Sequence, residues 1–502
     1  MRTADVDALA RDLAAAGFTG GGVRALVGEH AEAALARMVA EPARRAALRK
    51  PGPLATLLRA FVLGDPVTDA ELADALPTLG IEGAVALGIA ERRAGNGTPL
   101  VAPLVAIRPH AFRDALGTGE WWIASDLDEL AGVAPLRPDH VLGVGGAART
   151  LAHLLPPVAC GRSLDLGTGC GVIALHLRRF ADHVVATDIS ARALWFTALN
   201  ARLNGVDGVE IRLGSLFDPV DGERFDLIAS NPPFVITPRA EGVPAYEYRD
   251  GGATGDALMA AVVGGMALHL APGGAARLLG NWESIGAEPG LDRVRGWAGD
   301  ELDVWAIERD SLDPVRYAEL WLRDGGTLPR DDAHDALLDA WLDDFEARGV
   351  TSIGMGWLAL RRPLATASLA RFERLPHVVA LEHVGGHLAT AFDDAEWLAG
   401  LDDAALAAEH LVVPSDVTEA RHQVPGAAGP NVIELRQGGA LGRTVSVDTA
   451  LAALVGACDG ELALGVLVGA IAELLEVDDG ILAADVLPRV RELVLTGILR
   501  RA

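Results

Sequence analysis

The stretch of sequence that decides the fold reads Arg162-Ser163-Leu164-Asp165-Leu166-Gly167-Thr168-Gly169-Cys170-Gly171. Residues 162–166 have the pattern of a short strand, and residues 172–180 continue as a helix, so the glycines mark the turn between them. Glycines allow the backbone to pass close to a ligand. Because a strand, a Gly-x-Gly-x-Gly turn and a helix are shared by nucleotide-binding α/β folds, the stretch predicts such a fold and leaves the cofactor open.

Two later strands narrow the choice of cofactor. The apolar run 183–188 ends in Asp188, about twenty residues after the turn, where a carboxylate can accept hydrogen bonds from both hydroxyls of a ribose. Dinucleotides and S-adenosylmethionine both require such an acid. The third run, 225–230, leads directly into Asn231-Pro232-Pro233-Phe234. No dehydrogenase needs this tetrapeptide, so the order of the three elements favours S-adenosylmethionine.

The tetrapeptide suits methylation of a planar nitrogen. An amide or exocyclic amino nitrogen is a poor nucleophile because its lone pair is delocalised, so the NH₂ group must be held by both hydrogens and aimed at the methyl donor. The side-chain oxygen of Asn231 and the carbonyl of Pro232 can accept those two hydrogen bonds. Pro232 and Pro233 stiffen the loop and supply no competing N–H. Phe234 offers a flat apolar face on which a planar group can stack.

These motifs resemble those of class I methyltransferases that carry an Asn-Pro-Pro-(Tyr/Phe) motif. Within that group the chain is similar to the HemK/PrmC glutamine methyltransferases of release factors. The likeness continues through Arg249-Asp250-Gly251-Gly252 and Leu270-Ala271-Pro272-Gly273-Gly274, and it covers roughly residues 140–362.

The resemblance implies a site, a cofactor and an acceptor. It implies that S-adenosylmethionine is bound by Asp165, Gly167, Thr168, Gly169, Gly171, Asp188, Ile189, Ser215, Leu216 and Asn231. The catalytic loop would be Asn231, Pro232, Pro233 and Phe234. Two departures bear on the details. Ser215, between the second and third of these runs, stands where the family often has an acid for the adenine, and Phe234 stands where glutamine methyltransferases usually have Tyr. Since Phe is commoner in ribosomal RNA relatives, the acceptor stays open.

Length and pattern predict three parts. A chain of 502 residues has room for about three domains. We expect a helical, winged-helix-like domain over residues 1–139, the methyltransferase domain over 140–362, and an α+β domain over 363–502 that ends in a second winged-helix-like segment. The fold class is therefore α/β, with a Rossmann-like methyltransferase domain between two winged-helix-like flanks. In the N-terminal part, helices are expected over residues 22–40 and 81–92, and the segment from Trp121 to Val144 is expected to be a linker.

Charge and composition indicate the kind of partner. The formal net charge is −26, and no segment is basic, which disfavours nucleic acid as a partner and favours a protein acceptor. The one local basic cluster is Arg44, Arg45, Arg49 and Lys50, which suits a solvated helix face. The 3 cysteines lack metal-ligand spacing, so no metal is expected. No signal peptide or membrane span is evident, which predicts a cytoplasmic protein.

Three functions remain on the sequence alone. The first is transfer of a methyl group to a side-chain amide of a protein, of the glutamine type. The second keeps the enzyme and changes the acceptor to an exocyclic amine of RNA or DNA, or to a small metabolite. The third is a regulator that binds S-adenosylmethionine, has lost catalysis and uses winged helices to bind DNA. The intact tetrapeptide disfavours loss of catalysis.

Overall fold

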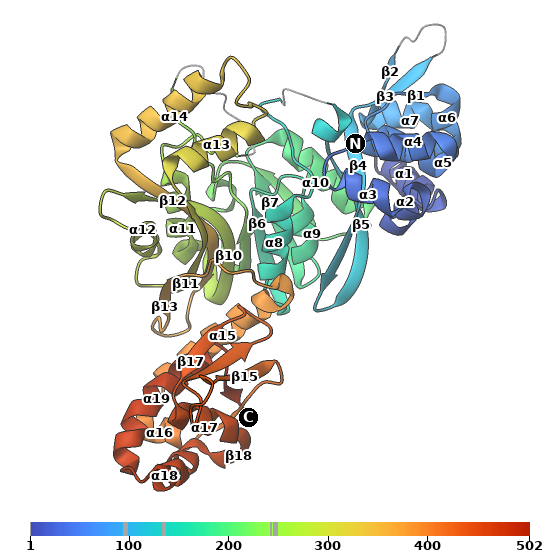
Figure 1. Ribbon diagram of the computed structural model, residues 1–502. Helices are drawn as coiled ribbons and strands as arrows, with labels where there is room; N and C mark the ends of the chain where they lie inside the picture. The colour runs from blue at the N-terminus through green and yellow to red at the C-terminus, as the bar shows by residue number, and fades with distance from the viewer. Residues whose placement is uncertain (1, 94–98, 133–136, 241–242, 244–248) are drawn as a thin grey trace.

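The computed structural model describes residues 2–93, 99–132, 137–240, 243 and 249–502. Figure 1 shows the N-terminal helices beside a central sheet, with the C-terminal residues forming a separate lobe below it. Among the described residues, no helix combines the length and the apolar character that a membrane crossing requires.

The centre of the molecule is an eight-stranded sheet. From one edge to the other its strands are β13 (Ala370–Arg374), β11 (Asp303–Leu312), β12 (Val350–Arg361), β10 (Leu270–Ile285), β9 (Phe225–Ser230), β6 (Cys160–Leu166), β7 (Ala181–Asp188) and β8 (Val209–Leu213). Strands β8, β7, β6, β9 and β10 run parallel, while β12 is antiparallel to both of its neighbours. This order confirms the predicted Rossmann-like class I methyltransferase fold.

The sheet is buried on both faces, as the apolar runs of its strands require. One face packs against α8 (Gly146–Leu154), α9 (Val172–Leu177) and α10 (Ala191–Leu203), and the other against α11 (Ala257–His269) and α12 (Gly290–Ala298). Alternate residues of a strand serve the two layers. On β7, Val184 packs with the first set of helices and Val185 with the second, and both side chains are fully buried.

The N-terminal part contains more elements than the sequence predicted. Its helices are α1 (Thr3–Ala15), α2 (Gly20–Val27), α3 (Glu29–Leu35), α4 (Glu41–Arg49), α5 (Pro53–Leu57) continuing as a π-helix (Leu58–Val62), α6 (Asp69–Ala75) and α7 (Gly80–Leu87). The helix expected over 22–40 is two helices, because Gly28 adopts φ +83° between them. The helix expected over 81–92 ends at Leu87, where Gly88 takes the left-handed conformation.

A small antiparallel sheet follows these helices. It is formed by β1 (Val67–Thr68), β3 (Leu100–Pro103) and β2 (Ala90–Arg93) in that order. The segment expected to be a linker begins as a strand: β5 (Gly117–Asp126) pairs along its whole length with β4 (Val105–Asp114). The N-terminal part thus contains more β structure than predicted, and its winged-helix assignment stays a prediction.

Two helices interrupt the antiparallel pair β11 and β12. They are α13 (Pro314–Asp324) and α14 (His334–Arg348), and α14 is the amphipathic helix that the alternation of acidic and apolar residues predicts. Trp341 and Phe345 of α14 pack with Tyr317 of α13 in a buried cluster of their own. Figure 1 places this helical pair above the sheet, at one end of its strands.

The C-terminal part begins at the sheet and ends in the lobe. Strand β13 extends the sheet beyond residue 362 by pairing with β11. Helix α15 (Val384–Ala399) packs against α8, and the lobe then comprises α16 (Asp403–Ala407), β14 (His410–Val412), β15 (Val417–His422), β16 (Val432–Gln437), β17 (Thr444–Val447), α17 (Thr449–Ala457), β18 (Asp459–Ala463), α18 (Leu464–Leu475), α19 (Asp479–Leu495) and β19 (Arg500–Arg501). The lobe has its own apolar core.

Candidate active site

Three of the predicted site residues lie in one row at the carboxyl edge of the sheet. Leu166 of β6 is in register with Thr187 of β7 on one side and with Ser230 of β9 on the other. The next residues along the three strands are Gly167, Asp188 and Asn231. Since neighbouring strands lie about 4.8 Å apart, the three motifs meet within a short distance at the strand ends.

The turn after β6 depends on glycine at three positions. Gly167, Gly169 and Gly171 have φ values of +78°, +56° and +82°, a conformation that side chains rarely adopt. At Gly171 a Cβ atom would also lie 2.9 Å from Thr197 of α10, whereas at Gly167 and Gly169 a Cβ atom would meet no other described atom within 4 Å. The turn therefore brings backbone N–H groups to the start of α9 and leaves the side at Gly167 and Gly169 open.

Asp188 connects the second strand to the glycine turn. Its carboxylate accepts hydrogen bonds from the backbone N–H of Gly169 at 2.9 Å and from that of Ser190 at 2.8 Å. Burial raises the pKa of this carboxyl above its ordinary value, while the backbone donors oppose the shift. The neighbouring Ile189 is 66% exposed, so it leaves an apolar side chain uncovered beside the acid.

Asp165 lies beneath the turn. Its carboxylate is almost fully buried and accepts a hydrogen bond from the hydroxyl of Thr168 at 2.6 Å. Burial raises the pKa of Asp165 to about 7, with a smaller contribution from the charge of Asp188. Asp165 thus stabilises the turn through its hydrogen bond with Thr168. In this geometry it would act on a cofactor only by holding the turn in place.

Two polar residues of α10 hold the turn in place, and the sequence reasoning did not select them. Thr197 donates a hydrogen bond to the carbonyl of Gly169 at 3.1 Å. Asn200, which is fully buried, donates to the carbonyl of Cys170 and to that of Ala124 on β5, both at 2.8 Å, and accepts from the N–H of Ala124 at 2.7 Å. A buried amide inside an apolar helix was the signal that could have identified it.

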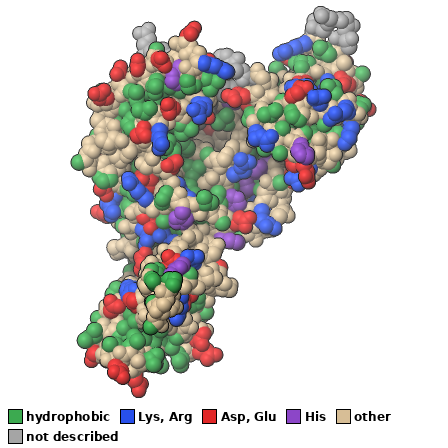
Figure 2. Space-filling view, in the orientation of Figure 1, with side chains coloured by type: hydrophobic (Ala, Val, Ile, Leu, Met, Phe, Trp, Pro, Cys, Tyr) green, Lys and Arg blue, Asp and Glu red, His purple; other side chains and the backbone are tan. Residues whose placement is uncertain are grey.

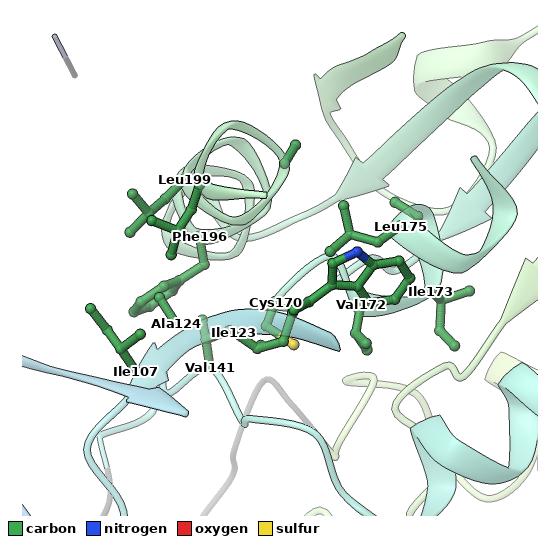
Figure 3. Close-up of a cluster of buried hydrophobic side chains, with 14 of the residues drawn as sticks. Ile107, Ile123, Ala124, Val141, Cys170, Val172, Ile173, Leu175, Phe196 and Leu199 are labelled. Atoms are coloured by element: carbon green, nitrogen blue, oxygen red, sulfur yellow. The ribbon is translucent and has the colours of Figure 1, made fainter. Parts of the chain in front are cut away.

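An apolar core lies behind these contacts and joins the hairpin to the turn. Figure 3 shows Ile107 and Ile123 of the hairpin facing Phe196 and Leu199 of α10, with Cys170 of the glycine turn between the helices. The N-terminal part therefore supports the back of the predicted cofactor site.

Asn231 has an unused acceptor atom. Its side-chain oxygen is buried and has no hydrogen-bond partner among the described residues. Buried polar atoms are normally paired, so an orphan acceptor at the end of β9 points to a donor that a ligand would supply. Pro232 beside it is buried, and Pro233 and Phe234 are half-buried.

The loop after the motif is fixed from two directions. Phe234 forms an isolated bridge with Asp250, and the N–H of Val235 donates to the carbonyl of Arg249 at 2.8 Å. The N–H of Ile236 donates to the hydroxyl of Tyr317 on α13 at 3.1 Å. The same hydroxyl accepts from the amide of Asn281 on β10 at 2.7 Å. No local signal could have revealed Tyr317, because it lies far away in the sequence.

A pocket adjoins the motif on the side of α11. Its walls are Pro233, Phe234, Val235, Gly251, Ala253, Gly255, Asp256, Leu258 and Met259. The floor near it is held by an ion pair between Asp250, whose side chain is almost fully buried, and Arg239, which also donates to the carbonyl of Ala253 at 3.1 Å. One face of Phe234 therefore borders an open space lined by small and apolar residues.

The remaining predicted cofactor residues follow β8. Ser215 is exposed, and Leu216 is half-buried with φ +46°. The N–H of Gly214 donates to the carbonyl of Asp188 at 3.0 Å, which ties this turn to the end of β7. Ser215 and Leu216 are thus placed beside the acid, on the side away from Asn231.

The fold and this row of residues define a class I methyltransferase. A model of the methyltransferase small domain matches residues 143–243, which include all three motifs. Two families described as domains of unknown function match the flanks, over residues 15–100 and 389–501.

Several relatives with curated names are glutamine methyltransferases. The release factor glutamine methyltransferase of Bordetella pertussis is 36% identical over 188 residues, which cover 35% of this chain and 67% of that protein. The enzyme of that name from Xylella fastidiosa strain Temecula1 is 40% identical over 24% of this chain and 47% of its own length. The ribosomal protein uL3 glutamine methyltransferase of Bradyrhizobium diazoefficiens is 34% identical over 28% of this chain and 46% of its own.

The chain therefore belongs to the S-adenosylmethionine-dependent methyltransferases with an Asn-Pro-Pro-(Tyr/Phe) motif, the family that includes the release factor glutamine methyltransferases. It spans about half the length of the Xylella relative. Among solved structures, the 16S rRNA N2 G1207 methyltransferase of Thermus thermophilus is 18% identical, with a TM-score of 0.27, over 51% of this chain and 64% of its own.

Proposed function

We propose that this protein transfers the methyl group of S-adenosylmethionine to the side-chain amide nitrogen of a glutamine in a protein. The orphan acceptor on Asn231 carries the proposal, because an amide NH₂ group supplies the donor that this atom lacks. The carbonyl of Pro232 would take the second hydrogen. The two acceptors would orient the nitrogen, and Phe234 would bound the plane of the amide.

The residues fit S-adenosylmethionine as the cofactor, which supplies an electrophilic sulfonium methyl group. The open side of the glycine turn would receive its methionine part, and Asp188 would accept hydrogen bonds from its ribose. Ile189, Ser215 and Leu216 would border its adenine. The chain's own contribution is positioning and electrostatic complementarity, so no strong general base is required.

The surface charges support a protein acceptor over a nucleic acid. Apart from the net charge of −26, Arg44 of the one local basic cluster already has acidic partners. Arg44 pairs with Asp65 at 2.9 Å and with Glu41 at 3.1 Å. Arg92, on strand β2 of the N-terminal small sheet, pairs with Asp69 and with Glu82, both at 2.6 Å. Arginines that are already paired with carboxylates contribute little to the affinity for a phosphate backbone.

A methyl-transfer assay tests the proposal. The purified chain is incubated with tritiated S-adenosylmethionine and with fractionated protein or RNA from the source cell. We expect label that resists nuclease, is removed by protease and is recovered as N-methylglutamine after digestion. Label that nuclease removes, together with a steep fall in activity with salt, would show a nucleic acid acceptor instead.

A further inference from the structure

The end of the C-terminal lobe carries an unusual concentration of exposed apolar side chains. Of the 24 large hydrophobic side chains that are exposed in the described chain, six fall within residues 462–481. They are Leu462, Val466, Leu474, Leu475, Val477 and Ile481, and we call this surface the α18–α19 patch. Leu474 and Ile481 are 78% and 72% exposed. Single exposed apolar residues are common, whereas a concentration of this kind marks an interaction surface.

Four members of the patch lie at the corner between α18 and α19. Leu474 and Leu475 are in the last turn of α18, and Val477 follows in the turn between the two helices. Leu467 and Ile471, earlier in α18, enter the core of the lobe. α18 ends at Glu476 in the left-handed conformation, and the chain turns there into α19, so that Ile481 lies in the first turn of the next helix.

The charged residues along this stretch of the chain are all acidic. Residues 444–488 contain eight acidic residues and no Lys, Arg or His. Asp448 and Asp485 pair with Arg489, whereas Glu473 and Glu476 at the end of α18 have no ion-pair partner among residues 249–502. Figure 2 shows hydrophobic and acidic side chains next to each other at the lower end of the molecule, where Figure 1 places α18.

The acidic residues around the patch indicate what kind of molecule binds there. A nucleic acid or an anionic membrane surface would be repelled by the acidic rim. A second copy of the chain, docking through the same patch by two-fold symmetry, would bring two acidic rims together. We propose that the α18–α19 patch docks a basic polypeptide segment that presents an apolar stripe, such as an amphipathic helix rich in Lys or Arg. Its leucines would cover the patch, and its cations would face Glu473 and Glu476.

Binding of a synthetic peptide to the full chain tests this proposal. The probe is a fluorescent helix of Leu and Lys with leucines at positions i, i+3, i+4 and i+7. A Leu/Glu helix with the same leucine positions and a Leu/Lys peptide with scrambled leucines serve as comparisons. We expect the first peptide to bind, with an affinity that falls as salt is added, and the other two to bind at least about tenfold more weakly.

Variants locate the binding on the surface. Leu474→Ser combined with Ile481→Ser should weaken binding roughly tenfold, as removal of anchor residues does. Glu473→Lys should weaken it through charge alone, and this exposed site tolerates the change. The matched control is Leu364→Ser, which removes a side chain that is 74% exposed outside the lobe. It should leave binding unchanged.

Several results would overturn the proposal. Equal binding of the Leu/Lys and Leu/Glu helices would show that charge does not select the partner. Unchanged affinity in the Leu474→Ser, Ile481→Ser variant would place the peptide elsewhere. A dimer that sedimentation detects in the natural chain and that this variant abolishes would make the occupant a second copy. Methyl transfer is not read in any arm, so the outcome is independent of the proposed function.

Discussion

At the scale of single residues, Asn231 and Asp188 are expected to act on different steps. Asn231→Ala removes an acceptor from the proposed amide site and leaves the glycine turn intact. We expect turnover to fall by about two to three orders of magnitude, by analogy with the loss of one preorganised polar contact at a reacting centre. Affinity for S-adenosylmethionine should change little. Single-turnover kinetics and calorimetry on the same preparation measure the two quantities.

Asp188→Ala is the control for that variant. It removes the proposed ribose acceptor, and calorimetry should show cofactor binding weakened by about 1.5 to 3 kcal/mol, the range for hydrogen bonds to a charged group. The two variants should therefore affect different quantities, turnover in one and cofactor affinity in the other. An Asn231→Ala protein that turns over normally and fails to bind cofactor would show that Asn231 holds the cofactor and not the acceptor amide.

Much of the candidate site was predictable at this scale because its parts follow strands. Gly167, Asp188 and Asn231 each come directly after a buried apolar run, and parallel strands bring such positions together. Asn200 and Tyr317 were not predictable, since each acts through contacts between segments that are distant in the sequence. Asn200 reaches Ala124 of β5, and Tyr317 reaches Ile236.

At the scale of elements, the side-chain amides of Asn200 in α10 and of Asn204 directly after α10 attach the hairpin β4–β5 to the methyltransferase domain. Asn200 bonds both Ala124 and the glycine turn, whereas Asn204 bonds only Trp122 of the hairpin, at 2.9 and 2.8 Å, and its own helix. Asn200→Ala leaves buried backbone groups unpaired, at a cost of about 1–3 kcal/mol for each group. We expect it to lower both Tm and cofactor affinity.

The matched variant Asn204→Ala separates these two effects. It should lower Tm and leave cofactor affinity close to that of the natural chain, because Asn204 does not touch the turn. Thermal unfolding and calorimetry report the two quantities. If Asn200→Ala lowered Tm alone, the link from α10 to Cys170 would have no part in shaping the cofactor site.

The same hairpin packs against α9 through a group of aromatic rings. The His176 ring lies 4.9 Å from that of Trp121 and 5.3 Å from that of Phe112, and burial lowers the pKa of His176 to about 3. Burial also lowers the pKa of His110 to about 4. The charge of Asp114 opposes the shift at His176.

These histidines make stability depend on pH. A depressed folded pKa means that the unfolded chain binds more protons below the ordinary histidine pKa of about 6.5, so stability is lost as pH falls. Between pH 7 and 5, His176 alone should cost about 2 kcal/mol. His176→Phe keeps a ring in the cluster and should flatten the fall of the unfolding free energy over this range. An equally steep fall in the variant would mean that other groups titrate there.

The sequence predicted the type of an element, helix or strand, more often than the residues at which it begins and ends. Helices of the N-terminal part end at Gly28 and Gly88, where a left-handed or otherwise positive φ interrupts an apolar pattern that itself continues. The second strand of the hairpin was mistaken for a linker because β5 carries Trp121 and Trp122 beside each other, which obscures the alternation of inward and outward residues. The sheet order, by contrast, follows from the class of fold.

At the scale of the whole molecule, a buried aromatic ring of α15 packs against the sheet next to the C-terminal lobe. Phe392 of α15 is almost fully buried, and the guanidinium carbons of Arg277 and Arg361 lie 5.5 and 5.6 Å from its centroid. Arg361 pairs with Asp303 at 2.9 Å. Arg277 is fully buried, has no acidic partner among the described residues and donates to the carbonyl of Leu154 at the end of α8, so burial lowers its pKa to about 9.

No sequence pattern could have shown this junction, because β10, α8 and α15 are brought together only by the fold. Phe392→Ala should destabilise the chain by about 3–5 kcal/mol, since it opens a cavity and exposes two cations that the ring covers. Hydrogen exchange should quicken in α8 and α15 together. The matched variant is Phe372→Ala, which removes a half-buried ring that lies 4.2 Å from the guanidinium carbon of Arg295 at the sheet edge. The Phe372→Ala variant should lose less unfolding free energy and leave hydrogen exchange in α8 slow. Equal effects of the two variants would mean that Phe392 contributes packing without coupling the lobe to the methyltransferase domain.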